Sequence, residues 1–154
     1  MKLNKIFALI ASLSLLTSCN NNNNQNSNSN INSIDTVSNN EPLDNGYFYK
    51  EIENIETGDV YNGFVDEDDI PQGYGIMYFS TGSVYYGDFV DGLPNGTGRY
   101  EWDSGCTYIG EMKEGAMHGR GYMSWPGGDY FYGEWKNGTF VYGTKYFLQP
   151  NTSI

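Results

Sequence analysis

The sequence predicts an all-β fold, an elongated, twisted antiparallel sheet of tandem β-hairpins. Residues 85–107 (YYGDFVDGLPNGTGRYEWDSGCT) are followed at once by 108–130 (YIGEMKEGAMHGRGYMSWPGGDY), where glycines and aromatic residues return in the same places after 23 residues. A fixed period of this kind is the signature of a repeat architecture. The 154 residues also include 20 Gly and 14 Tyr. That composition disfavours helices, and its tyrosines favour strands.

The repeat continues on both sides of these two units. Residues 61–84 form a unit with one residue inserted inside 66–70, and 46–60 are interpreted as an initial half-unit. Residues 131–148 are interpreted as a partial last unit. Atypical end units are expected, because an open array has to cover its core at both ends.

Each unit contains two runs of alternating apolar residues, separated by a turn. In the unit 85–107 the turn is predicted over Asp91–Gly96, and a second turn over Asp103–Gly105 leads to the next unit. Alternation with period two is typical of half-buried strands, paired here as a hairpin.

Stacking the units places like residues in columns, and four columns are predicted to form the core. They are Tyr61, Tyr85, Tyr108 and Phe131; Val65, Phe89, Met112 and Trp135; Met77, Tyr100 and Met123; and Phe79, Trp102 and Trp125. Glycines at 63, 87, 110 and 133 are expected to leave room for a ring from a neighbouring strand.

The N-terminal segment is predicted to be a signal peptide. Lys2 and Lys5 precede an apolar run at 6–16 that is too short to span a bilayer. Two kinds of signal peptide fit this segment, that of a lipoprotein and an ordinary secretory signal that happens to end near a cysteine. Residues 20–45, rich in asparagine, are expected to be a disordered linker.

The sequence Leu16-Thr17-Ser18-Cys19 resembles the lipobox of bacterial lipoproteins. The resemblance implies a diacylglyceryl group on Cys19, cleavage before it and acylation, for example with palmitate. Asn20 is not the aspartate that retains lipoproteins in the inner membrane, so the outer membrane of a bacterial envelope is favoured. The chain then divides into a signal peptide (1–18), a lipidated cysteine with its linker (19–45), a repeat domain (46–148) and a tail (149–154).

The chain is strongly acidic, with a net charge of −11, which becomes −13 if Lys2 and Lys5 are cleaved off. Such a surface repels phosphate backbones and anionic headgroups. The charge therefore argues against nucleic acid as a partner.

The unit pattern Y-x-G-x-[FMW]-x-x-G-x-x-x-G-x-G-x-[MY] resembles the MORN repeat (membrane occupation and recognition nexus). The residues that carry it are Tyr85, Gly87, Phe89, Gly92, Gly96 and Gly98 in one unit, and Tyr108, Gly110, Met112, Gly115, His118, Gly119 and Gly121 in the next. The resemblance covers about residues 57–140 and departs from the pattern at the insertion near Asp68 and in the last unit. It implies a β-hairpin array that is not catalytic by itself, so we expect no enzyme activity and no cofactor.

Few residues offer chemistry of their own. His118 is the one histidine, expected at the end of a turn in a structural or solvated role, and no transition-metal site is expected. The acidic run Asp66–Asp69 is interpreted as a solvated loop, with weak Ca²⁺ binding as the alternative. Asp88, Glu111 and Glu134 form a column about 10 Å apart, a spacing that an inverting glycosidase pair also shows. Any acidic β-array would produce that spacing, so a hydrolase using Glu111 and Glu134 is the weaker alternative.

The face opposite the rings carries a second aromatic pattern. Tyr86, Ile109 and Tyr132 repeat in phase there, with Tyr122 and Tyr78 on the partner strands. The chain has no spare segment to cover this face. An exposed aromatic stripe on a rigid sheet is a docking surface, and incidental surface aromatics are the alternative.

Cys106 stands where neighbouring units have Ser83 and Asp129, so it is expected in a turn and exposed. The alternatives for it are a surface thiol and a disulfide that links a homodimer. The sequence thus predicts a membrane-anchored, non-catalytic module that binds or scaffolds a protein or glycan at the bacterial envelope. Lipid association through the repeats themselves is the main alternative function.

Overall fold

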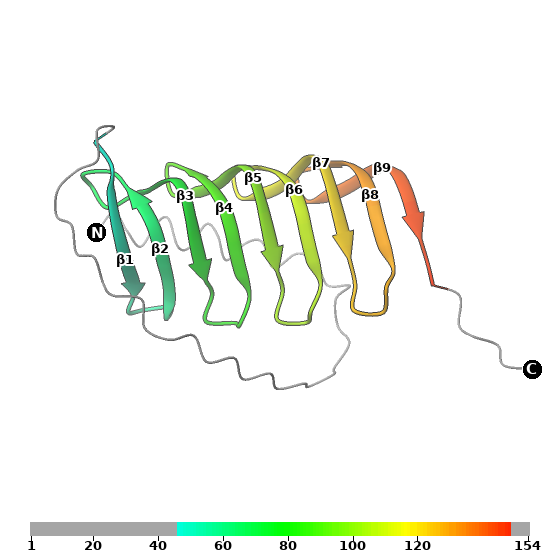
Figure 1. Ribbon diagram of the computed structural model, residues 1–154, viewed down its shortest axis with the longest axis horizontal. Helices are drawn as coiled ribbons and strands as arrows, with labels where there is room; N and C mark the ends of the chain where they lie inside the picture. Colours follow the sequence, from blue (N-terminus) through cyan, green and yellow to red (C-terminus); the bar gives the residue numbers. More distant parts are fainter. Residues whose placement is uncertain (1–45, 149–154) are drawn as a thin grey trace, which may run out of the picture.

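The computed structural model describes residues 46–148, which form one open sheet of nine antiparallel strands. The strands lie across the sheet in chain order, so each is hydrogen-bonded to its neighbours in the sequence (Figure 1). They are β1 (Phe48–Asn54), β2 (Asp59–Val65), β3 (Pro71–Tyr78), β4 (Val84–Val90), β5 (Leu93–Glu101), β6 (Thr107–Lys113), β7 (Ala116–Ser124), β8 (Tyr130–Lys136) and β9 (Thr139–Tyr146). The predicted all-β array of tandem hairpins is confirmed. The predicted signal peptide, linker and tail lie outside the described residues.

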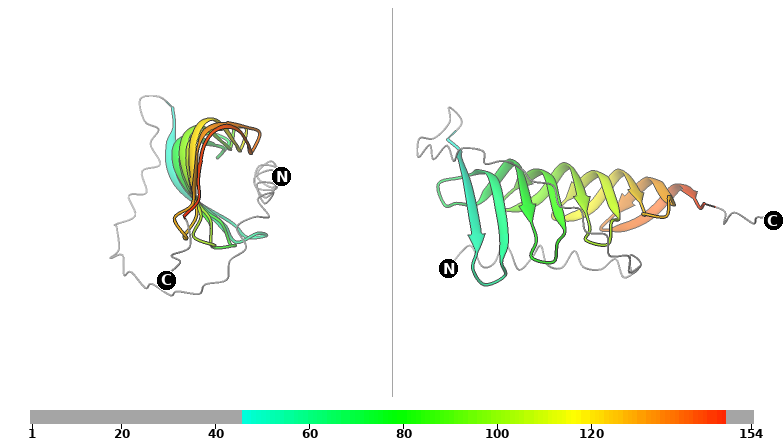
Figure 2. Two further views of the ribbon diagram at one scale, coloured as in Figure 1. Left: turned by 90° about the vertical axis from the view of Figure 1, so that its right-hand side faces the viewer. Right: turned by 60° about the horizontal axis from the view of Figure 1, so that its bottom comes forward.

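The sheet twists and curls along its length into an open trough (Figure 2). Curling brings the side chains of one face together, which lets rings in a single layer become fully buried. We call the face that carries these buried rings the inner face and the opposite one the outer face. Along β2 and β4, buried and less buried residues alternate, as one face of a strand requires.

The predicted core columns form the core of the inner face. Tyr61, Tyr85 and Tyr108 are fully buried, and Phe89 and Met123 are 1% exposed. The outermost predicted rings are partly buried and pack against this core; they are Phe79, Trp102, Trp125 and Phe131. The sequence did not predict Met117, which is also in the core, or Pro71 and Pro94, which are fully buried beside it.

Glycines face each other in pairs across the strands. A tyrosine lies over the pair in each of β2–β3, β4–β5 and β6–β7. Gly87 pairs with Gly98, and a Cβ at Gly98 would lie 2.5 Å from Cζ of Tyr85. The ring therefore comes from the same strand as Gly87, two residues earlier. The expectation that a neighbouring strand supplies the ring was wrong, because the tyrosine crosses its own strand to the next one.

The hydroxyl of each of these tyrosines donates a hydrogen bond to a backbone carbonyl oxygen. Tyr85 donates to the carbonyl oxygen of Asp88 at 3.2 Å, and Tyr61 to that of Phe64 at 2.7 Å. Tyr108 donates to the carbonyl of Glu111 at 2.8 Å. A buried hydroxyl needs such a partner. The bond is possible here because each strand has a bulge at this point, shown by the shift in register after its glycine.

The turns within the hairpins are shorter than predicted. Asp91 (φ 50°) and Gly92 (φ 80°) alone connect β4 to β5, and two positive φ values identify a type I′ turn. Leu93–Gly96, predicted as turn, begins β5 instead. Pro94 fits within this strand at the bulge, and its carbonyl accepts a hydrogen bond from Gly115 N at 2.9 Å. Of the turns inside the repeat units (β2–β3, β4–β5, β6–β7 and β8–β9), only that between β2 and β3, which has the inserted residue, is longer and covers 66–70.

Cys106 is 1% exposed and belongs to the core, so the expectation of an exposed turn residue was wrong. It lies two residues before Tyr108, and period-two alternation therefore points its side chain to the same inner face. Asp59 and Ser83 occupy the same position in their units and are also buried. The homodimer through Cys106 stays a prediction, although the exposure from which it was argued is not found.

Gly98→Ala should destabilise the fold, because its methyl group would overlap the buried ring of Tyr85. We expect a loss of about 1–3 kcal/mol in the free energy of unfolding. Gly127→Ala is the matched control, since a Cβ there meets nothing within 4 Å, and it should change stability by less than about 0.5 kcal/mol. Denaturant unfolding of both variants measures the difference. Equal midpoints would show that the ring does not need the glycine pair.

The protein should unfold at high pH. Burial raises the pKa of Tyr61, Tyr85 and Tyr108 well above their usual value of 10.0, and that of Tyr100 to about 12. The unfolded chain therefore releases these protons first, so stability is unaffected by them below pH 10 and falls as pH rises above it. Loss of the sheet signal in circular dichroism should coincide with the last step of the tyrosinate absorbance, which belongs to the buried tyrosines. Ionisation of these tyrosines with the sheet intact would contradict the burial.

Candidate binding surface

The outer face carries a row of residues paired from strand to strand along the array. We call the outer row Ile76, Tyr86, Arg99, Ile109, Tyr122 and Tyr132, which are successive register partners from β3 to β8. Its members are neighbours across a sheet, so their side chains form one continuous strip. Ile109 is 49% exposed and Tyr132 54%.

Four of the five predicted contact residues belong to this row. Tyr86, Ile109, Tyr122 and Tyr132 are brought together there. Tyr86 and Tyr122 are partly buried against their neighbours. Burial raises the pKa of Tyr86, and the nearby carboxylate of Glu101 adds to the rise.

The fifth, Tyr78, lies in a second, parallel row. It is 42% exposed and pairs with Val84, which in turn pairs with Glu101. At the far end of this row Tyr130 stacks on Tyr146, with ring centroids 5.1 Å apart. Tyr130 also contacts Tyr122 of the outer row, at 5.4 Å. The two rows therefore merge into one aromatic surface over β7–β9.

Four residues of this surface were not predicted from the sequence, namely Ile76, Arg99, Tyr130 and Tyr146. Strand register was the signal that could have found the first two, because partners in antiparallel strands have a constant sum of residue numbers within each hairpin. Ile76 pairs with Tyr86 and Arg99 with Ile109. Tyr146 lies beyond the point at which the repeat loses its period.

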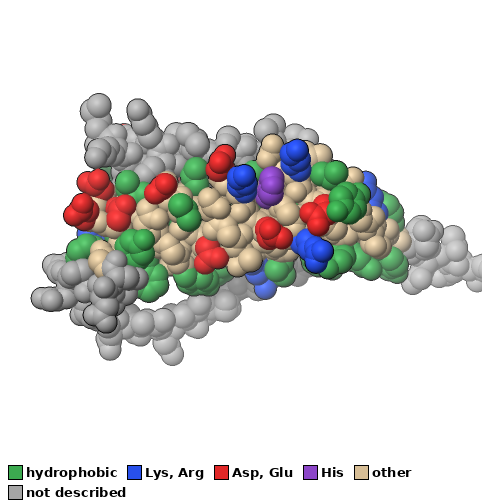
Figure 3. Space-filling model, turned by 90° about the horizontal axis from the view of Figure 1, so that it is seen from above, with side chains coloured by type: hydrophobic (Ala, Val, Ile, Leu, Met, Phe, Trp, Pro, Cys, Tyr) green, Lys and Arg blue, Asp and Glu red, His purple; other side chains and the backbone are tan. Residues whose placement is uncertain are grey.

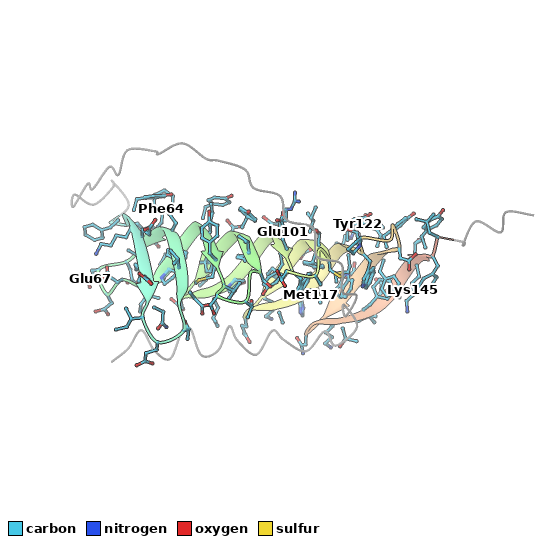
Figure 4. All side chains as sticks on the ribbon, turned by 90° about the horizontal axis from the view of Figure 1, so that it is seen from below. Phe64, Glu67, Glu101, Met117, Tyr122 and Lys145 are labelled. Carbon is cyan, nitrogen blue, oxygen red and sulfur yellow. The ribbon has the colours of Figure 1, made fainter. Side chains whose placement is uncertain are left out.

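Opposite charges are placed beside the outer row. Arg99 Nε lies 2.6 Å from Glu101 Oε1, two residues along the same strand. Arg120 Nε lies 3.5 Å from Glu134 Oε1 across the β7–β8 pair. Both arginines are more than half exposed, so these pairs contribute little to stability. They give the surface polar groups beside its rings. Figure 4 shows Phe64, Glu101 and Tyr122 following one another along the array, with Glu67 and Lys145 near its two ends.

The carboxylates of the predicted acidic column, Asp88, Glu111 and Glu134, bind groups of the neighbouring strand. Asp88 Oδ2 accepts hydrogen bonds from the N–H and the hydroxyl of Thr97 at 3.1 and 3.2 Å. Glu111 Oε1 accepts one from the N–H of Arg120 at 2.9 Å. Glu134 contacts the guanidinium of Arg120. Each carboxylate therefore has a partner in the sheet, and Glu111 and Glu134 share Arg120 between them.

His118 lies in β7, where it is the register partner of Glu111. The sequence placed it at the end of a turn, which the two-residue turn rules out. The hydroxyl of Tyr108, which donates to the carbonyl of Glu111, also lies 3.2 Å from the carbonyl oxygen of His118 and shares its hydrogen between the two. Its Nδ1 is buried without a hydrogen-bond partner in the described structure.

The acidic run forms the turn between β2 and β3. Asp66 Oδ1 accepts hydrogen bonds from the N–H groups of Asp68 and Ile70, both at 3.0 Å. Asp69 pairs with Lys50 of β1. Asp66 thus organises the turn itself, and Asp69 links it to β1. Within residues 46–148 no group of three or more His, Cys, Asp or Glu side chains is placed to hold a metal ion.

The predicted lipidation site, Cys19, lies outside the described residues. In the described part of the chain, no helix has the length and apolar content needed to cross a bilayer.

The family model of the MORN repeat matches three consecutive segments, residues 67–84, 85–107 and 108–130. No curated protein matches the chain in a sequence comparison. The second and third segments have the same bounds as the two complete units predicted from the period, and the first begins within the unit predicted at 61–84. MORN repeats suggest a module that binds membranes or proteins, and the family is generally not catalytic. The chain thus contains three tandem MORN repeats, over residues 67–130.

Proposed function

We propose that this chain is a lipid-anchored, non-catalytic module that binds or scaffolds a protein or glycan at the bacterial envelope. The array supplies a rigid surface and Cys19 supplies the anchor. Docking takes place on the outer row, centred on Ile109 and Tyr132.

The observation that carries the proposal is the exposure of apolar side chains on a regular face. Ile109 and Tyr132 are about half exposed, and no second layer of described residues covers them. Charged pairs lie beside them, as around the apolar centre of many protein interfaces. Aromatic side chains also stack on sugar rings, so a glycan remains the second class of partner.

Charge argues against direct lipid binding by the array. The mature chain, without Lys2 and Lys5, has six basic residues against nineteen acidic ones. Anionic headgroups would be repelled by such a surface. Attachment through Cys19 needs no basic patch, and a linker of 26 residues would hold the array roughly 25–30 Å from the membrane.

The docking surface can be tested by photo-crosslinking in the native membrane. A photoreactive amino acid at Ile109 should capture a protein or glycan, and Tyr132→Ala should lower the yield about tenfold or more, because central aromatic contacts dominate such interfaces. A photoreactive residue at Ile55, which is 90% exposed in the β1–β2 turn, is the matched control and should capture nothing specific. Equal capture from both positions would refute the outer row as the docking surface.

The lipid alternative has its own test. The mature chain carrying Cys19→Ala should not float with vesicles that contain anionic lipid, since both surfaces are negative. Tight flotation of this unacylated chain would show that the repeats bind lipid directly, and would replace docking by membrane association.

Glu111 allows a test of the non-catalytic assignment. Glu111→Gln retains an oxygen that accepts from Arg120 N, so stability should stay within about 0.5 kcal/mol. Glu111→Ala removes the acceptor and should cost about 0.5–1.5 kcal/mol in denaturant unfolding. Panels of glycan and ester substrates should show no turnover with any of these chains. Turnover by the wild-type chain that Glu111→Gln abolishes would establish a hydrolase instead.

A further inference from the structure

The outer face over β7–β9 carries tyrosines beside polar side chains. Strand register places six residues there in two rows of three, which we call the tyrosine platform. They are Arg120, Glu134 and Tyr142 in one row, and Tyr122, Tyr132 and Thr144 in the other. None of the six is aliphatic, and all three rings carry a hydroxyl group. The platform therefore combines apolar ring faces with groups that form hydrogen bonds.

Two of these rings have faces that no other ring of the described chain covers. Tyr132 is 54% exposed and Tyr142 66%. By contrast, Tyr122 packs against Tyr130, and Tyr130 against Tyr146, so these three rings cover one another. Tyr132 and Tyr142 are diagonal neighbours across the β8–β9 pair, a position in which the Cα atoms lie about 7–8 Å apart. The platform thus offers a ligand two separate ring faces, side by side.

Polar groups lie next to these two rings. Glu134 follows Tyr132 by two residues on the same face of β8 and is the register partner of Tyr142. Its Oε1 lies 3.5 Å from Nε of Arg120, whose side chain is 80% exposed. Thr144 is the register partner of Tyr132. A carboxylate accepts and a guanidinium donates several hydrogen bonds, so these side chains can bind more than one hydroxyl of a single ligand.

Charge limits the ligand to one without negative charge. Residues 46–98 contain ten acidic residues and one basic residue, whereas 99–148 contain six acidic and five basic residues. Figure 3 shows acidic side chains gathered at the β1 end of one face and basic ones farther along the array. The platform pairs one guanidinium with one carboxylate and is locally neutral, while the chain as a whole repels anions. A neutral ligand matches this charge distribution, and an acidic polysaccharide does not.

The chemistry of the platform matches a sugar more closely than a protein. A pyranose ring has an apolar face of C–H groups, which stacks on an aromatic ring, and a rim of hydroxyl groups, which bind charged and hydroxyl side chains. Tyrosine and arginine are common at protein interfaces as well, but there they surround an apolar core. With no aliphatic residue among its six and polar groups beside each exposed ring, the platform lacks such a core.

We propose that the tyrosine platform binds a neutral glycan. One sugar ring stacks on Tyr132 and another on Tyr142, and their hydroxyl groups are bound by Glu134, Arg120 and Thr144. This assignment rests on the proposed function, because the platform contains the β7–β8 end of the outer row. It identifies the partner of that row as a glycan without acidic groups.

Native gel electrophoresis of the full chain in detergent, through gels that contain a soluble polysaccharide, measures this binding directly. Hydroxyethyl cellulose, mannan and laminarin are the neutral probes, and polygalacturonate is the acidic control. At least one neutral polysaccharide should slow the chain relative to a reference protein, and polygalacturonate should not. Unchanged migration in all three neutral gels would overturn the proposal, and so would retardation by polygalacturonate as strong as that by a neutral probe.

Substitutions of exposed tyrosines then locate the binding. Tyr142→Ala should lower the affinity for the retarding polysaccharide about tenfold, whereas Tyr142→Phe keeps the ring and should retain most of it. Tyr74→Ala is the matched control, because Tyr74 is a 55% exposed tyrosine on β3, away from the platform, and its loss should leave the affinity unchanged. Circular dichroism confirms that the three variants fold. Equal losses in Tyr142→Ala and Tyr142→Phe, or in Tyr142→Ala and Tyr74→Ala, would show that stacking on this ring does not hold the glycan.

Crosslinking from Ile109 separates this proposal from the proposed function. Capture of a protein there, with no retardation by any neutral polysaccharide, would overturn the glycan and leave the outer row as a docking surface. Retardation that Tyr142→Ala removes, with no capture from Ile109, would support the tyrosine platform and overturn docking centred on Ile109.

Discussion

The fold depends on one repeated contact, a tyrosine ring lying across a facing pair of glycines. Its hydroxyl bonds to a backbone carbonyl three residues ahead, as Tyr108 does to Glu111. A single-layer sheet has no second layer to form a core with, so large rings must lie flat on the sheet itself. The glycines provide the floor, and the next ring closes the gap between units. Phe89 meets Tyr61 of the preceding unit edge-on at 5.1 Å and Tyr85 of its own unit at 5.2 Å.

A polar contact between neighbouring units accompanies this core, and its donor and acceptor residues change together from one unit to the next. Asp59 Oδ1 accepts a hydrogen bond from the N–H of Ser80 in the next unit at 2.8 Å. Ser83 Oγ accepts one from Asp103 N at 3.3 Å. In the following unit the turn residue is Pro126, which has no N–H, and the residue in the acceptor column is Cys106. Because residue 126 has no N–H, the change to Cys106 in the acceptor column leaves no backbone N–H there unsatisfied.

The sequence was enough to predict the columns of the core, because the period and the alternation together decide which residues share a face. It predicted too long a turn after Val90, because Pro94 and Asn95 are turn formers by local preference. The cross-strand contact between Asp88 and Thr97 fixes the bulge there, and such a contact cannot be read from neighbouring residues. Alternation would have placed Cys106 in the core, but comparison with Ser83 and Asp129 suggested a turn. On the outer face the repeat positions were sufficient for Ile109 and Tyr132, whereas Ile76 required the register.

Exposure of the outer face is a consequence of the architecture, since a single layer must leave one side uncovered. What the architecture does not require is the kind of residue found there. At the β1–β2 end the outer row continues into Asn62 and Glu51, which are hydrogen-bonded to each other. From β6 to β8 it consists of Ile109, Tyr122 and Tyr132. Along this row the sheet is therefore polar at the β1–β2 end and aromatic toward β8, although Tyr49 and Phe64 contact each other beside the polar end of the row. Solubility alone would favour polar residues along the whole face, so the aromatic half points to contacts with other molecules.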